Sequence, residues 1–359
     1  MTMIEILKNE PLAGHTTYGV GGPAKQFASV KSEDELREAL DYAQKNNLRV
    51  VVLGGGSNVL ISDEGFDGLV IKNEISGWSP EMPDKKVLLT VGAGEAWDSV
   101  VARAVVAGWA GLECLSGIPG SVGGALVQNI GAYGQTLADV VERVTFLDTE
   151  KDLIETCDKA ACEFVYRGSR FEQAESGRYI ITAVTLRLDV TKVSACDYKD
   201  YRFDMTAYMD KESGAPTLRN VRSAILDVRE QKGMVRLPGR QHLASAGSVF
   251  KNPVVEREQF EQMQTVARER NAELEESRQP WHWDVERGQV KISAAFLLEY
   301  TEFTKGYARD HVGISPKHTL SVINLGGATA VELRTFIDDM RADVDEIFGI
   351  KLELEIKLI

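Results

Sequence analysis

The sequence has few cysteines and no long apolar run. Its four cysteines are Cys114, Cys157, Cys162 and Cys196, and none belongs to a CxxC pair. Four cysteines in 359 residues are too few for a disulfide-rich scaffold, so we expect reduced, structural thiols. No stretch of about 18 apolar residues occurs, and the N-terminus lacks the apolar segment of a secretory signal. We therefore expect a cytoplasmic protein that does not bind membranes.

Positive charge is also in deficit. The chain carries 41 Lys and Arg residues against 54 Asp and Glu residues, which gives a formal net charge of −13. Binding to nucleic acid without sequence preference needs a dense cationic surface, so we expect no nucleic-acid partner. Small anionic ligands are not excluded, because a few Arg and Lys side chains can make one cleft locally positive. Ordinary hydrophobic and charged fractions, 43% and 26%, exclude a disordered chain.

The pattern of apolar residues predicts a mixed α+β protein. A chain of 359 residues is long enough for two or three domains. Apolar residues at helical spacing predict helices at 33–47, 97–107, 219–231, 254–275, 294–300 and 329–348. Short apolar or alternating runs predict strands at 49–53, 68–72, 87–91, 140–148, 179–188, 289–293, 318–324 and 351–359.

A first glycine-rich segment, Gly54–Leu60, follows a predicted buried strand. Glycine lets backbone N–H groups approach and cradle a phosphate, although a tight turn without a ligand is the alternative. The Gly-Lys-Ser/Thr of the nucleotide-binding P-loop is absent. The nearest match to a dinucleotide fingerprint, at 92–97, has Trp97 in place of the third glycine. The segment therefore predicts phosphate binding outside both of these nucleotide folds.

A second glycine-rich segment covers residues 111–134. Seven of its 24 residues are glycine, and it carries almost no charge. This composition predicts no helix, and the segment is too long for an ordinary surface loop. A backbone that lies against a large flat ligand would explain both features. A buried crossover with no ligand is the alternative.

Five blocks of sequence lie in order along nearly the whole chain: LGGGSNVL at 53–60, the whole segment 111–134, FVYRGSRF at 164–171, SAGSVFKNPVV at 245–255 and VKISAAFLLEY at 290–300. Together they resemble the MurB family of flavin-dependent UDP-N-acetylenolpyruvoylglucosamine reductases. The segments 229–235 and 303–307 resemble the form that is common in actinobacteria. The resemblance implies NADPH-dependent reduction of UDP-N-acetylglucosamine enolpyruvate to UDP-N-acetylmuramate through FAD, in peptidoglycan precursor synthesis.

The resemblance also implies an FAD-binding fold of the vanillyl-alcohol-oxidase type. This fold has two α+β subdomains and a third α+β domain that binds the substrate. We expect the first subdomain at 1–73, joined by the C-terminal strand 349–359, and the second at 74–229. The substrate domain is expected at 230–348.

The resemblance assigns cofactor and substrate contacts to residues of this chain. For FAD it implies Gly54, Gly55, Gly56, Ser57, Asn58, Gly117, Ile118, Pro119, Gly120, Gly123, Asn129 and Gly131. For the UDP part it implies Asn252, His318, the diphosphate lysine Lys232 and a loop tyrosine, Tyr198. Arg236 is an alternative to Lys232. NADPH would use the substrate's pocket in turn.

The implied chemistry sets two demands. Hydride addition at C3 of the enol ether leaves negative charge at C2 and in the carboxylate, so a cation and a proton donor are needed. Arg167 suits the carboxylate because a guanidinium binds it with two hydrogen bonds, and Tyr166 stands beside it. The family's proton donor corresponds to Ser248.

The resemblance assigns a further carboxylate to Glu355, whose pKa we expect burial to raise. Glu353 would lie on the same face of the predicted strand, so alternation does not choose between the two. The family assignment alone selects Glu355.

Two other functions compete with the reductase. A flavin oxidase of the same fold would keep the glycine-rich segments but would not need Ser248, Lys232 or Glu355. A non-catalytic UDP-sugar-binding protein would keep the C-terminal motifs without the flavin. We expect the reductase, as a monomer without a metal ion.

Overall fold

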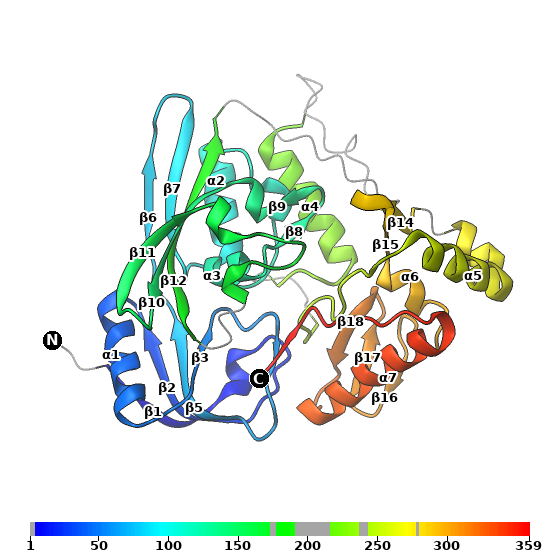
Figure 1. Ribbon diagram of the computed structural model, residues 1–359, viewed down its shortest axis with the longest axis horizontal. Helices are drawn as coiled ribbons and strands as arrows, with labels where there is room; N and C mark the ends of the chain where they lie inside the picture. Colours follow the sequence, from blue (N-terminus) through cyan, green and yellow to red (C-terminus); the bar gives the residue numbers. More distant parts are fainter. Residues whose placement is uncertain (1–3, 173–176, 191–215, 237–242, 278–279) are drawn as a thin grey trace. The chain divides into compact units, whose positions relative to one another are not determined.

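The computed structural model describes residues 4–172, 177–190, 216–236, 243–277 and 280–359, which form two compact units (Figure 1). Unit 1 comprises residues 1–11, 23–56 and 65–242, and unit 2 comprises residues 12–22, 57–64 and 243–359. Within unit 1 the elements are β1 (Leu7–Pro11), β2 (Pro23–Val30), α1 (Glu33–Lys45), β3 (Val50–Leu53), β5 (Phe66–Asn73), β6 (Trp78–Glu81), β7 (Lys86–Gly92), α2 (Trp97–Ala107), η2 (Glu113–Leu115), α3 (Val122–Val127), β8 (Gly131–Ala132), β9 (Gln135–Thr136), η3 (Leu137–Asp139), β10 (Val141–Asp148), β11 (Leu153–Asp158), η4 (Ala160–Cys162), β12 (Tyr179–Asp189) and α4 (Leu218–Gln231).

Within unit 2 the elements are η1 (Leu12–His15), β4 (Val59–Leu60), β13 (Val254–Val255), α5 (Arg257–Ser277), β14 (His282–Asp284), η7 (Glu286–Gly288), β15 (Val290–Ile292), α6 (Ala294–Leu298), β16 (Ala308–Arg309), β17 (Val312–Ser315), β18 (His318–Asn324), α7 (Ala330–Phe348) and β19 (Lys357–Leu358). The mixture of helices and strands confirms the predicted α+β class.

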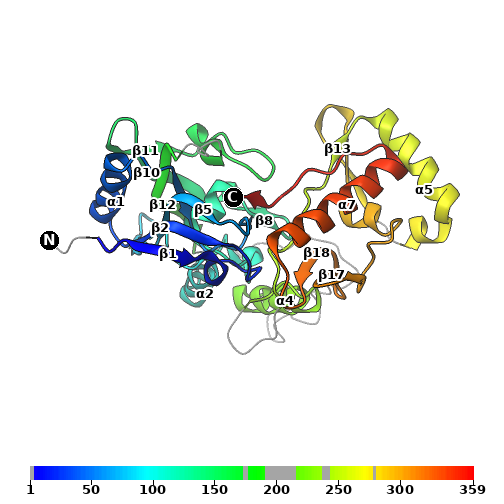
Figure 2. The same cartoon turned by 90° about the horizontal axis from the view of Figure 1, so that it is seen from below.

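The first sheet of unit 1 has the strand order β1-β2-β5-β3. Strands β2, β5 and β3 are parallel, whereas β1 runs antiparallel to β2. Helix α1 buries Leu36, Ala39 and Ala43 in the core that it shares with β2 and β5, which lie side by side in Figure 2. Its predicted start is confirmed: Ser32 accepts a hydrogen bond from Glu35 N–H, and acidic side chains in the first turn favour the helix dipole.

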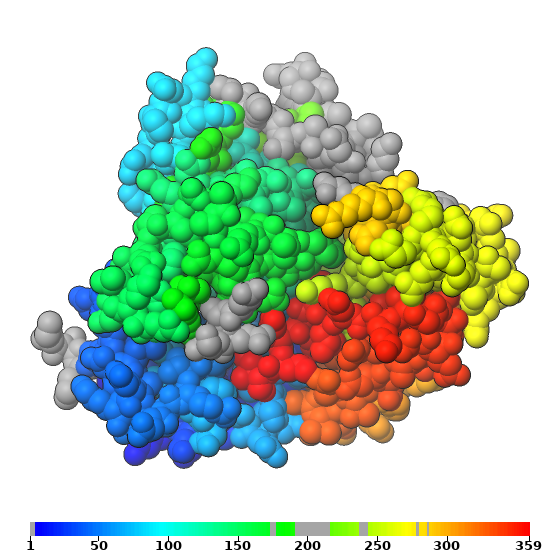
Figure 3. Space-filling view, viewed as in Figure 1, coloured from blue at the N-terminus to red at the C-terminus, as the bar shows by residue number. Residues whose placement is uncertain are grey.

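The second sheet of unit 1 is antiparallel and has the order β11-β10-β12-β7-β6. Helix α2 buries Trp97, Val100 and Val101 in the same core as β7, β10 and β12. The predicted end of this helix is confirmed, because Gly108 takes the left-handed conformation at φ 77°. The hairpin of β6 and β7 projects from the rest of the unit (Figures 1 and 3).

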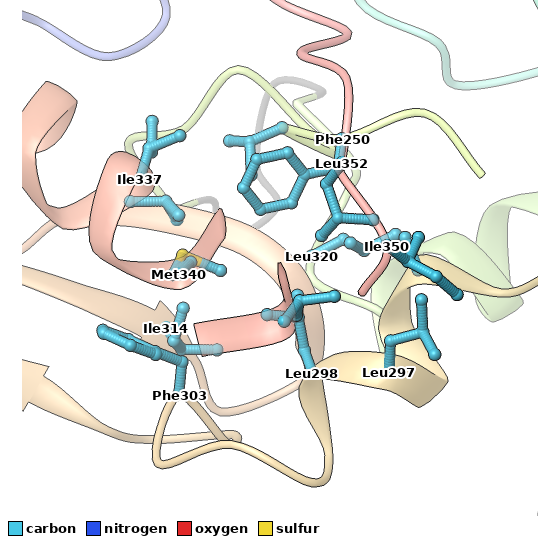
Figure 4. Packing of buried hydrophobic residues seen from close by; sticks show 14 of the residues in the cluster. Phe250, Leu297, Leu298, Phe303, Ile314, Leu320, Ile337, Met340, Ile350 and Leu352 are labelled. Carbon is cyan, nitrogen blue, oxygen red and sulfur yellow. The ribbon is translucent and has the colours of Figure 1, made fainter. Parts of the chain in front are cut away.

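Unit 2 is built on two three-stranded sheets, β13-β15-β14 and β16-β17-β18. Helix α7 contributes Ile337 and Met340 to one apolar core with β17 and β18. Figure 4 shows how Phe250 and Leu352 join this core from two segments that are far apart in the sequence. The core therefore holds both the segment around 250 and the C-terminal segment in place.

Two sequence predictions are wrong in detail. The predicted helix 254–275 begins with strand β13 before α5, and α5 has a non-helical residue at Asn271. The predicted C-terminal strand 351–359 reduces to β19 and a single bridge at Leu354. The chain bends at Glu355 because its N–H group bonds Val249 O while Lys357 N–H bonds Asn58 O.

The compact units also differ from the predicted domain boundaries. Residues 57–64 belong to unit 2, since β4 pairs in parallel with β19 and Ser62 N–H bonds Ile359 O. Unit 1 contains both sheets predicted for the two cofactor subdomains, one on each side of residue 73. The three-domain division stays a prediction.

His311 and Glu332 form an exposed ion pair that makes the start of α7 sensitive to pH. His311 Nδ1 lies 3.0 Å from Glu332 Oε1, and Glu332 Oε2 accepts from Thr329 N–H at 2.7 Å. This pair raises the pKa of His311 above 6.5 and lowers the pKa of Glu332 to about 2. The histidine's stabilisation is complete below its unfolded pKa and is lost as pH rises through the raised value. The glutamate's stabilisation is present above about pH 4.5 and is lost towards pH 2.

We expect the His311 ring to titrate above the ordinary histidine value, measured by NMR chemical shift against pH. In Glu332→Gln the His311 pKa should fall, because the neutral amide no longer favours the imidazolium. The amide retains a side-chain oxygen that can accept from Thr329 N–H, so loss of the helix cap would not account for the change. Equal pKa values in both proteins would contradict the ion pair.

Candidate functional site

The first glycine-rich loop begins where β3 ends. Lys72 on the neighbouring strand β5 donates a hydrogen bond to Gly54 O, and burial lowers the pKa of this lysine. Gly56 takes a left-handed conformation at φ 64°. The loop therefore combines a glycine backbone without side chains with a lysine ammonium at its base.

The two glycine-rich loops pack against each other through backbone atoms. A Cβ atom added to Gly55 would lie 2.5 Å from Gly120 Cα, and one added to Gly54 would overlap Ser121 Oγ. Gly120 itself has φ 117°, which side chains rarely allow. Only glycine at Gly55 permits this approach, so packing between loops accounts for part of the glycine content that suggested a flat ligand.

The second loop contains regular structure that the sequence did not predict. Residues 113–115 form η2 and residues 122–127 form α3, so the prediction of no helix is wrong. Ser121 caps α3 through Gly124 N–H, and Val122 and Leu126 are buried in the core of unit 1. Gly123 N–H bonds Ala93 O at 2.8 Å, which ties this helix to the end of β7.

The segment 117–119 lies between α2 and α4. Gly117 N–H donates to Asp98 Oδ1 at 2.6 Å, and Arg222 binds both oxygens of Asp98 at 2.7 Å. Ile118 packs against the apolar core of unit 1, followed in the chain by Pro119. Asp98 thus connects α2, the second loop and α4.

Asn129 connects the second loop to the turn that carries Arg167. Asn129 Nδ2 donates to Val165 O at 3.0 Å, and its Oδ1 accepts from Ala138 N–H at 3.0 Å. Ser169 Oγ, just beyond the turn, donates to Val127 O at 2.9 Å. These contacts within the chain are sufficient to account for an asparagine at this position.

Arg167 lies over the second loop. It has φ 58°, and its Nη1 is 3.5 Å from the position that a Cβ on Gly131 would take. A Cβ at Gly131 would only touch the guanidinium, and its tighter contacts would be with Thr136 at 3.1 Å and Gln135 O at 3.3 Å. The neighbouring Tyr166 is exposed, and its ring centroid is 5.7 Å from the Arg167 guanidinium carbon.

Positive charge collects around Tyr133, another residue of the second loop. Lys232 Nζ lies 5.4 Å from the Tyr133 ring centroid, and Lys232 is only 7% exposed. Arg229, 8% exposed, donates to Met234 O at 3.0 Å. Burial lowers the pKa of Arg229, while Tyr133 and Asp98 oppose this and Arg167 adds to it. Each buried cation is costly, and an anionic ligand offsets that cost.

Sequence reasoning did not select Tyr133 or Arg229. For each of these two residues, the sequence or the helix pattern contains one feature that could have identified it. Tyr133 is a bulky residue among glycines, and the structure gives it φ 52°, a conformation that is unusual for an aromatic residue. Arg229 falls on the buried face of α4 with Val221, Ile225 and Val228, where an arginine is out of pattern.

Ser248 and Glu355 lie on neighbouring segments of unit 2. Ser248 forms an antiparallel bridge with Ser321 on β18, and Val249 N–H bonds Leu320 O at 3.0 Å. On its other side, Val249 O accepts from Glu355 N–H at 2.8 Å. The apolar contacts of Phe250 hold this segment between β18 and the C-terminus (Figure 4).

The structure separates the two candidate glutamates. Glu355 is half-buried, whereas Glu353 is exposed. Asn58 Nδ2 donates to Glu355 O at 2.9 Å, so Asn58 positions the backbone of this glutamate. Ser57, the preceding residue in the chain, is half-buried and belongs to the same unit.

Two of the predicted UDP-binding residues also lie in unit 2. Asn252 Oδ1 accepts from Ala294 N–H at 3.0 Å, at the start of α6. His318 Nδ1 accepts from Leu320 N–H at 3.2 Å, so a neutral His318 ring carries its proton on Nε2. Tyr198 lies outside the described residues.

Both loops fit a dinucleotide cofactor. The backbones at Gly54 and Gly55 carry no side chains where the loops pack together, so a pyrophosphate can approach the main chain closely. Lys72 adds a cation beside Gly54. Within the described ranges, no group of three His, Cys, Asp or Glu residues is arranged to hold a metal ion. No helix in that part of the chain is both long and apolar enough to cross a membrane.

The loops suit a dinucleotide, and comparison with known proteins gives the class, a flavin-binding oxidoreductase. Residues 24–158 match the FAD binding domain family, and residues 239–359 match the C-terminal domain of UDP-N-acetylenolpyruvoylglucosamine reductase. The chain belongs to the UDP-N-acetylenolpyruvoylglucosamine reductase family, MurB.

This chain aligns with proteins of that name over nearly their whole length. The reductase of Thermobifida fusca is 41% identical over 349 residues, which cover 96% of this chain and 95% of that protein. The reductase of Streptomyces coelicolor is 36% identical, with 97% and 89% covered. The crystal structure of MurB from Thermus caldophilus is 25% identical and superposes with a TM-score of 0.62, covering 99% of this chain and 98% of that one.

We expect Gly55→Ala to destabilise the protein by about 1–3 kcal/mol, because the new methyl group would collide with Gly120 backbone. The substitution should also weaken FAD binding, since the loops must move apart. Urea unfolding and flavin titration measure the two effects.

Gly124→Ala is the matched control. Its added Cβ would have Ser121 Oγ as its nearest neighbour at 3.5 Å, and it lies inside α3, where alanine is about 0.5–1 kcal/mol more favourable than glycine. Equal losses of stability in both variants would contradict the packing of Gly55 on Gly120.

Proposed function

We propose that this protein reduces UDP-N-acetylglucosamine enolpyruvate to UDP-N-acetylmuramate with NADPH, a step in peptidoglycan precursor synthesis. The observation that carries the proposal is the presence, in one chain, of an FAD-binding segment and the C-terminal domain found in this reductase family. Both named relatives match over nearly their whole length, which supports the same activity.

The competing functions are not favoured. A flavin oxidase acting on another alcohol or sugar has no need of the reductase C-terminal domain that residues 239–359 match. A UDP-sugar-binding protein without catalysis has no need of the FAD-binding segment at 24–158. The chain has both parts.

FAD held by the glycine-rich loops would supply hydride transfer from NADPH to C3 of the enolpyruvyl group. Arg167 binds the substrate carboxylate, where negative charge grows during the reaction, because a guanidinium keeps its charge and forms paired hydrogen bonds. Tyr166 donates a further hydrogen bond in the same region. The positive charge around Tyr133, from Arg229 and Lys232, supports anion binding on this unit.

Ser248 delivers the proton to C2. Glu355 acts beside it as a hydrogen-bond donor to the enolate, provided that its carboxyl group is protonated. Its half-buried setting supports this role better than that of the exposed Glu353. The backbone bond from Glu355 to Val249, the residue after Ser248, supports a joint action of the two side chains.

The UDP part is bound by Lys232, Asn252, His318 and Tyr198. Since Asn252 Oδ1 already accepts from Ala294, its amide nitrogen is the group that would donate to the ligand. His318 would donate from Nε2, because its Nδ1 already accepts from Leu320 N–H. Lys232 binds the diphosphate, and Arg236 is the alternative residue for this role.

The proposal also covers the cofactor, the substrate domain, the location of the enzyme and its oligomeric state. The glycine-rich segments bind FAD, and residues 230–348 form the substrate domain. The enzyme works in the cytoplasm as a monomer, where it supports cell wall biogenesis and, through it, cell shape and division.

We expect Ser248→Ala to separate the two half-reactions. Reduction of the flavin by NADPH needs no proton at C2, so its rate should stay near that of the wild type. Loss of a positioned acid should slow the second half-reaction by about 10²–10⁴-fold. Stopped-flow measurement of flavin reoxidation, by substrate and without oxygen, tests this. Unchanged reoxidation would assign the proton to Glu355 or water.

We expect Lys232→Ala to weaken substrate binding by about 10- to 150-fold, the effect of losing a charged hydrogen bond worth roughly 1.5–3 kcal/mol. Lys232→Met keeps the aliphatic stem beside Tyr133 and should show a similar loss. Titration calorimetry with the UDP substrate measures both. If Arg236→Ala loses affinity while Lys232→Met does not, the diphosphate belongs to Arg236.

A further inference from the structure

Two thiols of unit 1 lie close together beside the turn of Arg167. Cys157 Sγ and Cys162 Sγ are 3.9 Å apart. Cys157 is half-buried near the end of β11, an edge strand of its sheet, whereas Cys162 is buried in η4. Cys157 is therefore the more exposed of the two residues, and Cys162 Sγ lies within 3.9 Å of its sulfur.

The surroundings make the two thiols unequal. A hydrogen bond from Cys162, aided by the nearby Arg170 guanidinium, lowers the pKa of Cys157 despite its partial burial. The bond to Cys157 and burial raise the pKa of Cys162, and Cys162 Sγ also lies 3.3 Å from Asp158 O. The Asp158 carboxylate opposes Arg170 at both thiols. A thiolate close to a cation is the reactive form of cysteine.

Arg170 is itself firmly held. Its guanidinium carbon lies 4.8 Å from the Tyr179 ring centroid and 5.5 Å from those of Phe146 and Phe171. Its Nη1 donates to Ala161 O at 3.2 Å, inside η4. The cation that favours the Cys157 thiolate is thus bonded to the 3-10 turn that carries Cys162.

The thiol pair adjoins the turn that positions Arg167. Glu163 follows Cys162 with φ 48°, and the turn closes with two backbone bonds between Val165 and Gly168, at 3.0 and 3.2 Å. Arg167, at φ 58°, lies at its tip. Both non-glycine residues hold left-handed conformations, so a shift of η4 acts on a backbone with little freedom to absorb it.

We propose that Cys157 and Cys162 are a redox modification site, in which a reversible disulfide displaces the Arg167 turn and weakens the active site. The oxidant is a peroxide. Cys157 thiolate attacks one peroxide oxygen, forming a sulfenic acid and releasing water or an alcohol. Cys162 sulfur then attacks the sulfenic sulfur, the S–S bond forms, and the second oxygen leaves as water. Each cysteine loses its thiol hydrogen as a proton, and the two sulfurs together lose two electrons to the peroxide.

Bond formation requires movement. A disulfide has a sulfur separation of about 2.05 Å, so the two atoms must approach by roughly 2 Å. Strand β11 is held by β10 along its length, including the pair Cys157 and Val144. The movement therefore falls mainly on η4 and the turn that follows it.

The test uses the flavin-loaded protein with Cys114→Ser and Cys196→Ser, which leaves this pair as its only cysteines. After hydrogen peroxide treatment, mass spectrometry should show the loss of two hydrogen atoms and a link between the Cys157 and Cys162 peptides, reversed by dithiothreitol. Hydrogen exchange of residues 163–172 should change with the link. The effect on catalysis is measured separately, because it rests on the proposed function. The kcat/KM for the UDP substrate should fall by on the order of 10- to 100-fold.

Cys162→Ser is the control. It should form a sulfenic acid at Cys157 that dimedone traps, without a disulfide and without the exchange change at 163–172. Absence of the link in the parent protein, or a link without altered exchange or kcat/KM, would overturn the proposal. If the parent protein shows the link and the exchange change but never reduces the UDP substrate, the proposed function fails and the thiol site stands.

Discussion

The packing of Gly55 on Gly120 is the contact on which the cofactor half of the site depends. Two loops that are 65 residues apart in the chain meet backbone to backbone, with room for no side chain at Gly55. This contact fixes the start of α3, and the asparagine that follows α3 holds the carbonyl of Val165. The turn of Arg167 is thereby positioned from the glycine loops, so the cofactor and carboxylate contacts proposed above would share one support.

Charge is distributed against the overall balance of the chain. The protein has a formal net charge of −13, yet Arg229 and Lys232 are almost fully buried around Tyr133. Burying a cation is costly, and the lowered pKa of Arg229 expresses that cost. The proposed substrate carries a diphosphate and a carboxylate, and desolvated cations bind such anions more strongly than exposed ones.

In unit 2 the side chains of the site are set by backbone bonds. Ser248 pairs with Ser321 on β18, and Glu355 bonds Val249 and Asn58. The Leu320 N–H group selects the tautomer of His318. Apolar packing of Phe250, Leu320 and Leu352 supplies the rigidity that these polar groups need (Figure 4).

Local sequence determined the elements whose signals lie within a few residues. Helices α1, α2 and α7 were predicted from periodicity, and Ser32, Gly108 and Thr329 mark ends that the structure confirms. The glycine-rich loops pointed to a phosphate and a flat ligand, and the family resemblance pointed to FAD and to the predicted site residues, but neither selected Tyr133 or Arg229. The individual roles of the predicted site residues stay predictions, because no side chain contact with a ligand follows from sequence.

Tertiary structure decided everything that depends on distant partners. The bond from Asn58 to Glu355 joins residues 297 positions apart, and β4 exists only because β19 pairs with it. Alternating charge predicted a strand at the C-terminus, but bonds to Val249 and Asn58 bend the chain there instead. The burial of Arg229, the proximity of Cys157 to Cys162 and the need for glycine at 55 likewise arise from packing, which a pattern read along one segment does not contain.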